Sequence, residues 1–177
     1  MMSNKGFTLI ELMITLVIAA ILLTTAVPSF EALITNNRLS TQANAFIGAL
    51  YLARAEAIKR NLDVTVCKSG DGQNCSNNAS GFEQGWIVFV DKQNFGIHDV
   101  LQASDPDFEA IINTNQGMPQ GMSLDDQTVS YRSDGTPASF NNTTLRLCQQ
   151  GNNNGRHIVI SVTGRVRVEE SNDCPIN

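Results

Sequence analysis

The feature that most constrains this chain is an apolar run near its N-terminus, FTLIELMITLVIAAILLTTAV, from Phe7 to Val27. As a helix, its 21 residues would span roughly 31 Å, which is enough to cross the hydrocarbon core of a bilayer. The run contains one formal charge, Glu11, and an ionised group at the membrane centre costs roughly 2.5–3.5 kcal/mol. An acid at this position therefore predicts a partner of opposite charge.

The charges that flank the run predict its orientation. Lys5 precedes it and the next basic residue is Arg38, so the positive-inside rule places the N-terminus in the cytoplasm and the rest of the chain outside. A cleaved secretory signal fits poorly, because the run is too long and no A-x-A-like site follows it. A plain signal anchor is the simpler alternative, but it gives no reason for Glu11.

Cleavage between Gly6 and Phe7 would account for Glu11. Residues 1–6 would then be a leader peptide, and Glu11 would be the fifth residue of the mature chain. The new α-amino group on Phe7 would lie nearby, and an opposite charge is what a carboxylate needs in a medium of low dielectric constant.

Residues 29–61 are predicted to continue the helix in amphipathic form. Pro28 should bend the helix, because its ring removes one backbone hydrogen bond and clashes with the preceding turn. Apolar residues then recur at steps of three and four, which predicts one buried stripe and a helix end near Asn61. The stripe consists of Leu39, Ala43, Phe46, Ile47, Leu50, Ala53, Ala57 and Ile58.

Beyond Asn61 the apolar period changes to two, which predicts a β-rich head domain over residues 62–177. We expect strands at 62–68, 85–91, 99–103, 127–133, 143–149, 156–162 and 165–169. Residues 69–84 and 104–123 are predicted to be loops, and 149–155 should connect a long hairpin. The fold class is therefore α+β, with an antiparallel sheet or a pair of sheets covering one face of the helix.

Four cysteines predict two disulfides if the head lies in an oxidising compartment. Sequence proximity favours Cys67 with Cys75, which closes nine residues, and Cys148 with Cys174, which closes 27. The two other connectivities stay open. A zinc site has less support, because no histidine lies at finger-like spacing from a cysteine pair.

The sequence contains no pattern typical of an enzyme or of a cofactor site, such as G-x-S-x-G, H-E-x-x-H or a Walker loop. His98 and His157 are expected to be surface or hydrogen-bonded residues. Asp105, Asp107 and Glu109 offer oxygen ligands for calcium, although a solvated acidic loop is the simpler interpretation. We therefore expect neither catalysis nor a bound cofactor.

The clearest surface signal is VTGRVRVEE, residues 162–170. The Thr-Gly pair that ends at Gly164 favours a tight turn or a bulge. Arg165 and Arg167 are two residues apart in extended chain, so both should project from one face. Two guanidinium groups on one face can grip successive phosphates, the commonest contact that proteins make with nucleic acid.

Arg156, at the other end of the hairpin, and Lys68 are expected to add to this patch. Two acids follow it at once, and the chain carries a net charge of -5, which repels DNA as a whole-molecule field. Alternating Arg and Val is also typical of any solvent-exposed strand. From these residues alone, DNA binding and an ordinary surface strand are both open.

The N-terminal pattern resembles the class III signal of type IV pilins and type II secretion pseudopilins. The residues that carry the resemblance are Gly6, Phe7, Glu11 and Pro28. It implies that a prepilin peptidase cleaves after Gly6 and methylates the amine of Phe7. It also implies that Glu11 pairs with the N-terminal amine of a neighbouring subunit during assembly.

The chain as a whole resembles the GspH/FimT family of minor pilins and pseudopilins. The further matching features are the helix end YLARAEAIKRN at 51–61 and the G-R-x-R of Gly164, Arg165 and Arg167. The resemblance implies a type IV pilin-like fold and a single-pass protein of the inner membrane with a periplasmic head. Segment 7–28 would then enter the filament core, near the pilus tip, among other major and minor pilins.

The same resemblance implies three alternative roles. FimU-type members are minor pilins that prime pilus assembly. FimT-type members bind extracellular DNA in natural transformation through a C-terminal G-R-x-R, which makes double-stranded DNA an expected partner. GspH-type members are minor pseudopilins of type II secretion systems, and such a role would involve no DNA.

Overall fold

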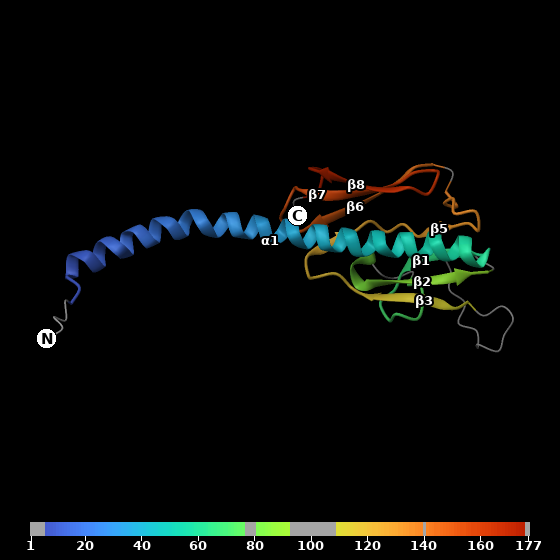
Figure 1. Ribbon diagram of the computed structural model, residues 1–177, viewed down its shortest axis with the longest axis horizontal. Helices are drawn as coiled ribbons and strands as arrows, with labels where there is room; N and C mark the ends of the chain where they lie inside the picture. The colour runs from blue at the N-terminus through green and yellow to red at the C-terminus, as the bar shows by residue number, and fades with distance from the viewer. Residues whose placement is uncertain (1–5, 77–80, 93–108, 140, 176–177) are drawn as a thin grey trace. The chain divides into compact units, whose positions relative to one another are not determined.

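The computed structural model describes residues 6–76, 81–92, 109–139 and 141–175 (Figure 1). The chain divides into two compact units, Met1–Arg38 and Leu39–Asn177. A single helix, α1 (Leu9–Arg60), contributes to both units, and the strands belong to the second.

The first unit consists of the N-terminal part of α1. Its large apolar side chains, from Phe7 to Ile34, are between 49% and 82% exposed in the part of the chain that the structure describes. By length and composition α1 could cross a membrane, and it is the one such helix among the described residues. The helix continues through Pro28 without interruption, and the bend expected there stays a prediction.

In the second unit α1 buries most of the predicted stripe. Leu39, Phe46 and Leu50 are fully buried, and Ile47 packs partly buried against the core. Ile58 was expected in the stripe but is 53% exposed, and Ala49 is buried instead. The reason is rotational: Ala57 already faces the core in that turn, and the next residue points about 100° away from it.

The helix ends where the sequence predicts. Asn61 adopts a positive φ of 52°, and the Leu62 N–H donates to the carbonyl of Ala57 at 3.3 Å. A left-handed residue with such a backward bond is a common way for a helix to stop.

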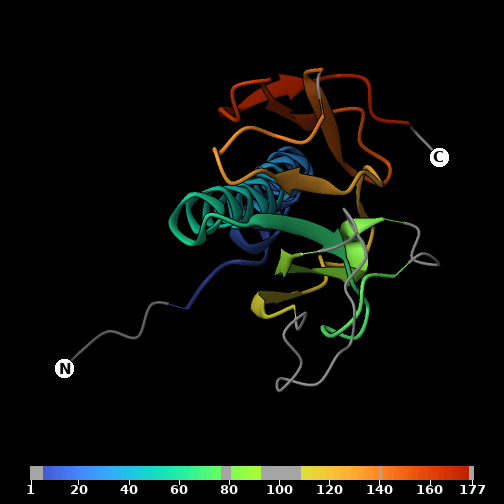
Figure 2. The same ribbon diagram turned by 90° about the vertical axis from the view of Figure 1, so that its right-hand side faces the viewer.

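The head contains two four-stranded antiparallel sheets, in the orders β3-β2-β1-β5 and β4-β6-β7-β8. In Figure 2 the two sheets lie along one flank of the part of α1 that belongs to the second unit, and side chains from this part and from both sheets form one main core. The α+β prediction is thus confirmed, in its form with a pair of sheets. The strands are β1 (Asp63–Lys68), β2 (Gly85–Asp91), β3 (Ile111–Gln116), β4 (Met122–Leu124), β5 (Val129–Tyr131), β6 (Thr143–Gln149), β7 (Gly155–Ile160) and β8 (Val166–Ser171), with a short 3-10 helix at Phe82–Gln84.

Two strands, β3 and β4, were not expected. The stretch 104–123 was predicted to be a loop, but β3 lies within it and β4 begins at its end. Both are edge strands of their sheets, where a short or polar sequence such as IINTNQ suffices. The predicted strand 99–103 lies outside the described residues. The loop 149–155 connects β6 to β7, as expected.

Both favoured disulfides are present, Cys67–Cys75 and Cys148–Cys174. The second one fastens the C-terminal tail to β6, and the Cys174 N–H also donates to the carbonyl of Asn153 at 3.2 Å. The tail at Cys174 is therefore anchored to the sheet that carries the G-R-x-R residues.

Candidate functional site

The G-R-x-R residues begin at the turn that joins β7 to β8. The Gly164 N–H donates to the carbonyl of Ser161 at 2.8 Å, and the Ser161 N–H donates to the carbonyl of Arg165 at 2.9 Å. The Ser161 hydroxyl oxygen accepts the Arg165 N–H at 3.1 Å. Gly164 has a φ of 77°, which L side chains rarely adopt, so the predicted tight turn is confirmed.

The register of β7 and β8 decides which side chains share a face. Ile160 pairs with Val166, and Ile158 pairs with Val168. Ile158, Ile160 and Val166 are buried, so this face of the sheet is the core face. Alternation then places Arg165 and Arg167 on the opposite face, which we call the outer face, and both side chains are exposed there.

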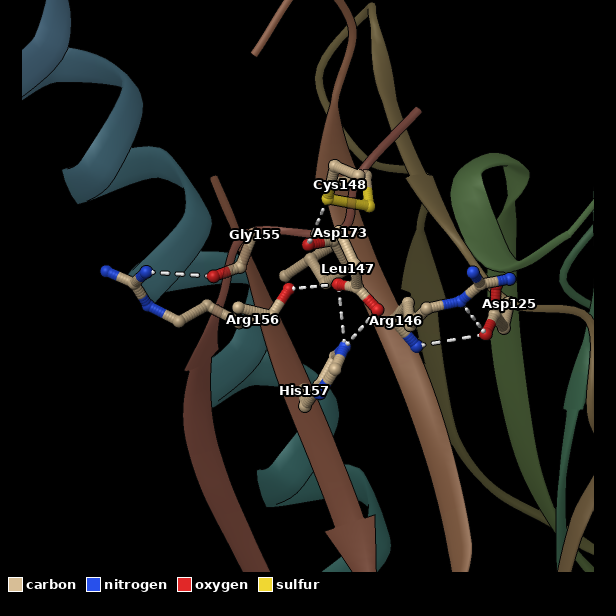
Figure 3. A network of polar contacts seen from close by, with 10 residues as sticks. Asp125, Arg146, Leu147, Cys148, Gly155, Arg156, His157 and Asp173 are labelled. Carbon is tan, nitrogen blue, oxygen red and sulfur yellow. Dashed lines mark hydrogen bonds and ion pairs between the residues drawn. A yellow bond between two sulfur atoms is a disulfide. The ribbon is translucent and has the colours of Figure 1, made fainter. Parts of the chain in front are cut away.

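Arg156 and Lys68 do not join this outer face, which corrects the predicted patch. Arg156 lies two residues before the buried Ile158 and therefore on the core face of β7. Its side chain is only 12% exposed, and its guanidinium lies 3.5 Å from a Glu170 carboxylate oxygen. Figure 3 shows it pointing away from Arg146 and His157. Lys68 belongs to β1 in the other sheet and pairs with Asp126 at 2.5 Å.

Two cationic or polar residues that the sequence analysis did not place in the patch lie on the outer face instead. Arg146 on β6 pairs in register with His157 on β7, and His157 pairs with Glu169 on β8. In TTLRLCQ, Arg146 lies between the buried residues Leu145 and Leu147, so its alternation with them could have revealed it. His157 is hydrogen-bonded at the surface, as expected.

Most charges of the outer face are paired with acids. Arg146 lies 3.0 Å from Asp125, and Arg167 lies 2.6 Å from Glu169. Figure 3 shows the Arg146–Asp125 pair and the contact of His157 with Asp173, which is 3.0 Å long.

The contacts of Asp173 favour its charged form. A hydrogen bond from the Ser171 hydroxyl is the main cause that lowers the pKa of Asp173, and His157 adds to it. Within the described part of the chain, Arg165 is the arginine of this face that has no carboxylate partner. In the described ranges the outer face therefore carries paired side chains and, at the turn, one arginine without a carboxylate partner.

Arg54 on α1 also reaches the turn, and sequence reasoning did not identify it. Its guanidinium donates to the carbonyls of Thr163 and Gly164 at 2.9 and 3.1 Å. These residues are 109 and 110 positions away in the chain, so no local pattern signals the contact.

A family model described as type II transport protein GspH matches residues 42–164, which include α1 in the head and most of the strands. The chain belongs to the GspH family. A second model, the prokaryotic N-terminal methylation motif, matches residues 1–27. The apolar helix and this motif together indicate a membrane anchor of the prepilin kind.

The fold of this GspH-family chain is similar to crystal structures of the type IV minor pilin FimU from Pseudomonas aeruginosa (strain PAO1). One, in space group P21, is 20% identical, covers 80% of this chain and 95% of that chain, and has a TM-score of 0.56. The other, in space group P65, is 20% identical, covers 77% and 97%, and has a TM-score of 0.54. The minor pseudopilin EpsH of Vibrio cholerae has a TM-score of 0.48 at 16% identity, covering 75% and 96%. No curated protein matches the sequence.

The FimU likeness confirms the pilin-like fold, while the processing and assembly residues stay predictions. Phe7 is exposed, and Glu11 lies in the first turn of α1, where its N–H donates to the Thr8 hydroxyl at 3.3 Å. Cleavage after Gly6 and the pairing of Glu11 with a neighbouring amine involve other molecules.

The acidic calcium candidates fall largely outside the structure. His98, Asp105 and Asp107 lie outside the described residues. Glu109 is buried and accepts the Lys92 N–H at 2.9 Å. In the described ranges no group of three His, Cys, Asp or Glu residues could hold a metal ion.

Proposed function

We propose that this GspH-family protein is a minor type IV pilin that is incorporated at or near the pilus tip and supports pilus assembly. The observation that carries the proposal is the first unit, a helix whose large apolar side chains are exposed on every side. Such a surface needs lipid or other apolar helices around it. The proposal involves neither catalysis nor a cofactor.

In this proposal the chain starts as an inner-membrane precursor with a cytoplasmic N-terminus and a periplasmic head. Prepilin peptidase cleaves after Gly6 and methylates Phe7. Segment 7–28 then leaves the lipid for the filament core, where helices of major and minor pilins cover it. Glu11 neutralises the amine of a neighbouring Phe7, because an unpaired charge in a dry core is costly.

The test compares Glu11→Ala with Glu31→Ala, which removes an acid elsewhere on the same helix. We expect both variants to be cleaved normally, the first to be missing from sheared filaments and the second to be incorporated. Incorporation of Glu11→Ala at the level of the unsubstituted protein would reject the role of Glu11.

We further propose that the head binds double-stranded DNA in natural transformation, through the turn at Gly164 and the arginines that follow it. Support comes from Arg165 and Arg167, which lie exposed on one face of the β7–β8 hairpin. Arginines of this kind contact phosphates, so the binding should be independent of base sequence.

A gel shift at several salt concentrations tests the DNA proposal. Replacing Arg165 and Arg167 by Ala should weaken binding and reduce the slope of log K against log salt by about 1.8, since two phosphate contacts are lost. Binding that survives the double substitution, or that does not decline with salt, would reject this surface.

The second candidate function is a minor pseudopilin of a type II secretion system without a DNA-binding role. The family model, described as a type II transport protein, favours it. Deletion of the gene would then abolish secretion of folded exoproteins and leave transformation unchanged. The opposite pair of phenotypes would favour the type IV pilus.

A further inference from the structure

We propose that Arg54 of α1 is a positioning residue for the DNA-binding turn, because it holds the backbone on which Arg165 is mounted. The inference rests on the proposed DNA function and assigns to one residue of the helix end YLARAEAIKRN, Arg54, a role in the head's binding site. Arg54 acts through Arg165 and does not itself contact DNA.

The first support is the pair of hydrogen bonds from one guanidinium to two successive carbonyls. Nη1 of Arg54 donates to Gly164 at 3.1 Å, and Nη2 donates to Thr163 at 2.9 Å. A planar fork fits two neighbouring acceptors at once, whereas a lysine ammonium is a single point charge on a flexible stem. Both Nη groups are occupied by the protein's own backbone, which favours positioning over phosphate contact.

The second support is a bond on the other side of Arg165. The Tyr51 hydroxyl, three residues before Arg54 on the same helix, donates to the carbonyl of Val166 at 3.2 Å. Residues three apart on a helix lie on neighbouring parts of its surface. The helix therefore holds the residues just before and just after Arg165.

The third support is the close packing around the Arg54 guanidinium. A Cβ added at Gly164 would lie 2.5 Å from the carbonyl oxygen of Gly135 and 3.1 Å from Nε of Arg54. A Cβ added at Gly135 would lie 2.7 Å from Cδ1 of Ile58 and 3.3 Å from the same Nε. The turns at Gly135 and Gly164 thus both pack closely against Arg54, and at Gly164 any larger residue would disturb this packing.

Arg54 forms no ion pair with any residue that the structure describes. Its helical neighbours Lys59 and Arg60 both pair with Glu56, whereas Arg54 has no carboxylate within salt-bridge distance among the residues that the structure describes. Its donors serve the two turn carbonyls instead. A turn fixed before DNA arrives saves the entropy of ordering Arg165 on binding.

The experiment is a double-mutant cycle on DNA affinity, with the full chain purified in a nonionic detergent and a short double-stranded DNA of random sequence. The variants are Arg54→Gln, Arg165→Ala and the two combined. Arg60→Gln is the matched control, because it removes a charge from the same helix without touching the turn.

We expect Arg54→Gln to weaken binding about three- to tenfold with an unchanged salt slope, since the phosphate contacts stay in place. Arg165→Ala should lower the slope by about 0.9. Combined with Arg165→Ala, the Arg54 substitution should add less than about twofold, because its effect passes through Arg165. Arg54→Lys should behave like Arg54→Gln.

Amide hydrogen exchange tests the same point without DNA. Arg54→Gln should speed exchange of the Gly164 amide, which donates to Ser161, and leave the β6–β7 ladder protected as in the unsubstituted chain. Unchanged exchange at Gly164 would overturn the inference, and so would loss of protection throughout the head, because Arg54 would then serve the fold as a whole.

The two proposals fail in different ways. Additive effects in the cycle, a slope reduced by about 0.9 for Arg54→Gln, or an equal loss for Arg60→Gln would overturn the positioning role alone. An unsubstituted protein that binds no DNA would overturn the DNA function and the inference together.

Discussion

Among the described residues of the outer face, each cation except Arg165 lies beside an acid, and this pairing sets what the face can bind. Arg167 lies 2.6 Å from Glu169, and both side chains are about half exposed. An exposed pair of this kind is worth less than about 1 kcal/mol, so a phosphate can replace the carboxylate. The pairing also suits an acidic protein with a pI of about 4.9.

Glu169→Gln should therefore raise DNA affinity by roughly two- to fivefold at low salt, because it releases Arg167. Glu170→Gln removes the same charge one residue away, but its partner Arg156 lies on the core side of the strand, so its gain should be smaller. Gel shifts of both variants measure the difference. Equal gains would mean that only net charge matters, and no gain from Glu169→Gln would contradict the account.

Tyr131 is a fully buried residue whose hydroxyl has no hydrogen-bond partner among the described residues. Burial raises its pKa to about 12 from an ordinary value of 10.0, since the charged form is poorly solvated in the core. The folded state thus holds the phenol proton more tightly than the unfolded state. The stability that this gives is complete below pH 10.0 and is lost as the pH rises toward about 12.

Comparison of the unsubstituted protein with Tyr131→Phe measures this effect. Between pH 9 and about pH 11, the unsubstituted protein should lose about 1.4 kcal/mol of unfolding free energy relative to the variant. Urea unfolding at each pH gives the difference, and other alkaline titrations cancel in the comparison. Parallel pH profiles for the two proteins would show that Tyr131 is not protected from ionisation.

At the scale of elements, the parts that follow from local pattern were predictable. The helix end at Asn61 and the core strands β1, β2, β6 and β7 agree with the expected segments to within two residues, because their apolar periodicity reflects one buried face. The edge strands β3 and β4 were missed, since an edge needs no such pattern. Ile58 was misplaced because a stripe read from sequence cannot show which of two adjacent apolar residues faces the core.

The Cys148–Cys174 disulfide should stabilise the head mainly by shortening the unfolded chain. Replacing both cysteines by alanine should lower the free energy of unfolding by about 3.6 kcal/mol, as chain entropy predicts for a loop of this size. Urea unfolding measures the loss. The tail should also become sensitive to carboxypeptidase, and an unchanged unfolding free energy with a protected tail would show that packing alone holds it.

At the scale of the whole molecule, the candidate site was predictable only in part. The period of two placed Arg165 and Arg167 on one face, and the register of the sheet bears this out. That register also separates Arg156 from them and brings Arg146 to the same face. The contact of Arg54 with the turn depends on how a helix packs on a hairpin more than 100 residues away, which no local pattern contains.

The second unit buries its apolar side chains in a core, whereas the first unit exposes them, and this contrast supports the assembly proposal. Every member of the main core cluster lies between Leu39 and Val166, within the second unit. In the first unit, the large apolar side chains that the structure describes are between 49% and 82% exposed. Lipid before assembly and neighbouring pilin helices after it are the environments that suit such a surface.

The most direct test of the assembly proposal is mass spectrometry of the protein recovered from sheared surface filaments, with and without prepilin peptidase. The account predicts an N-terminal peptide that begins with N-methylated Phe7, present in filaments only when the peptidase is active. A filament-borne chain that keeps residues 1–6, or a processed chain found in the membrane but never in filaments of any type, would contradict it.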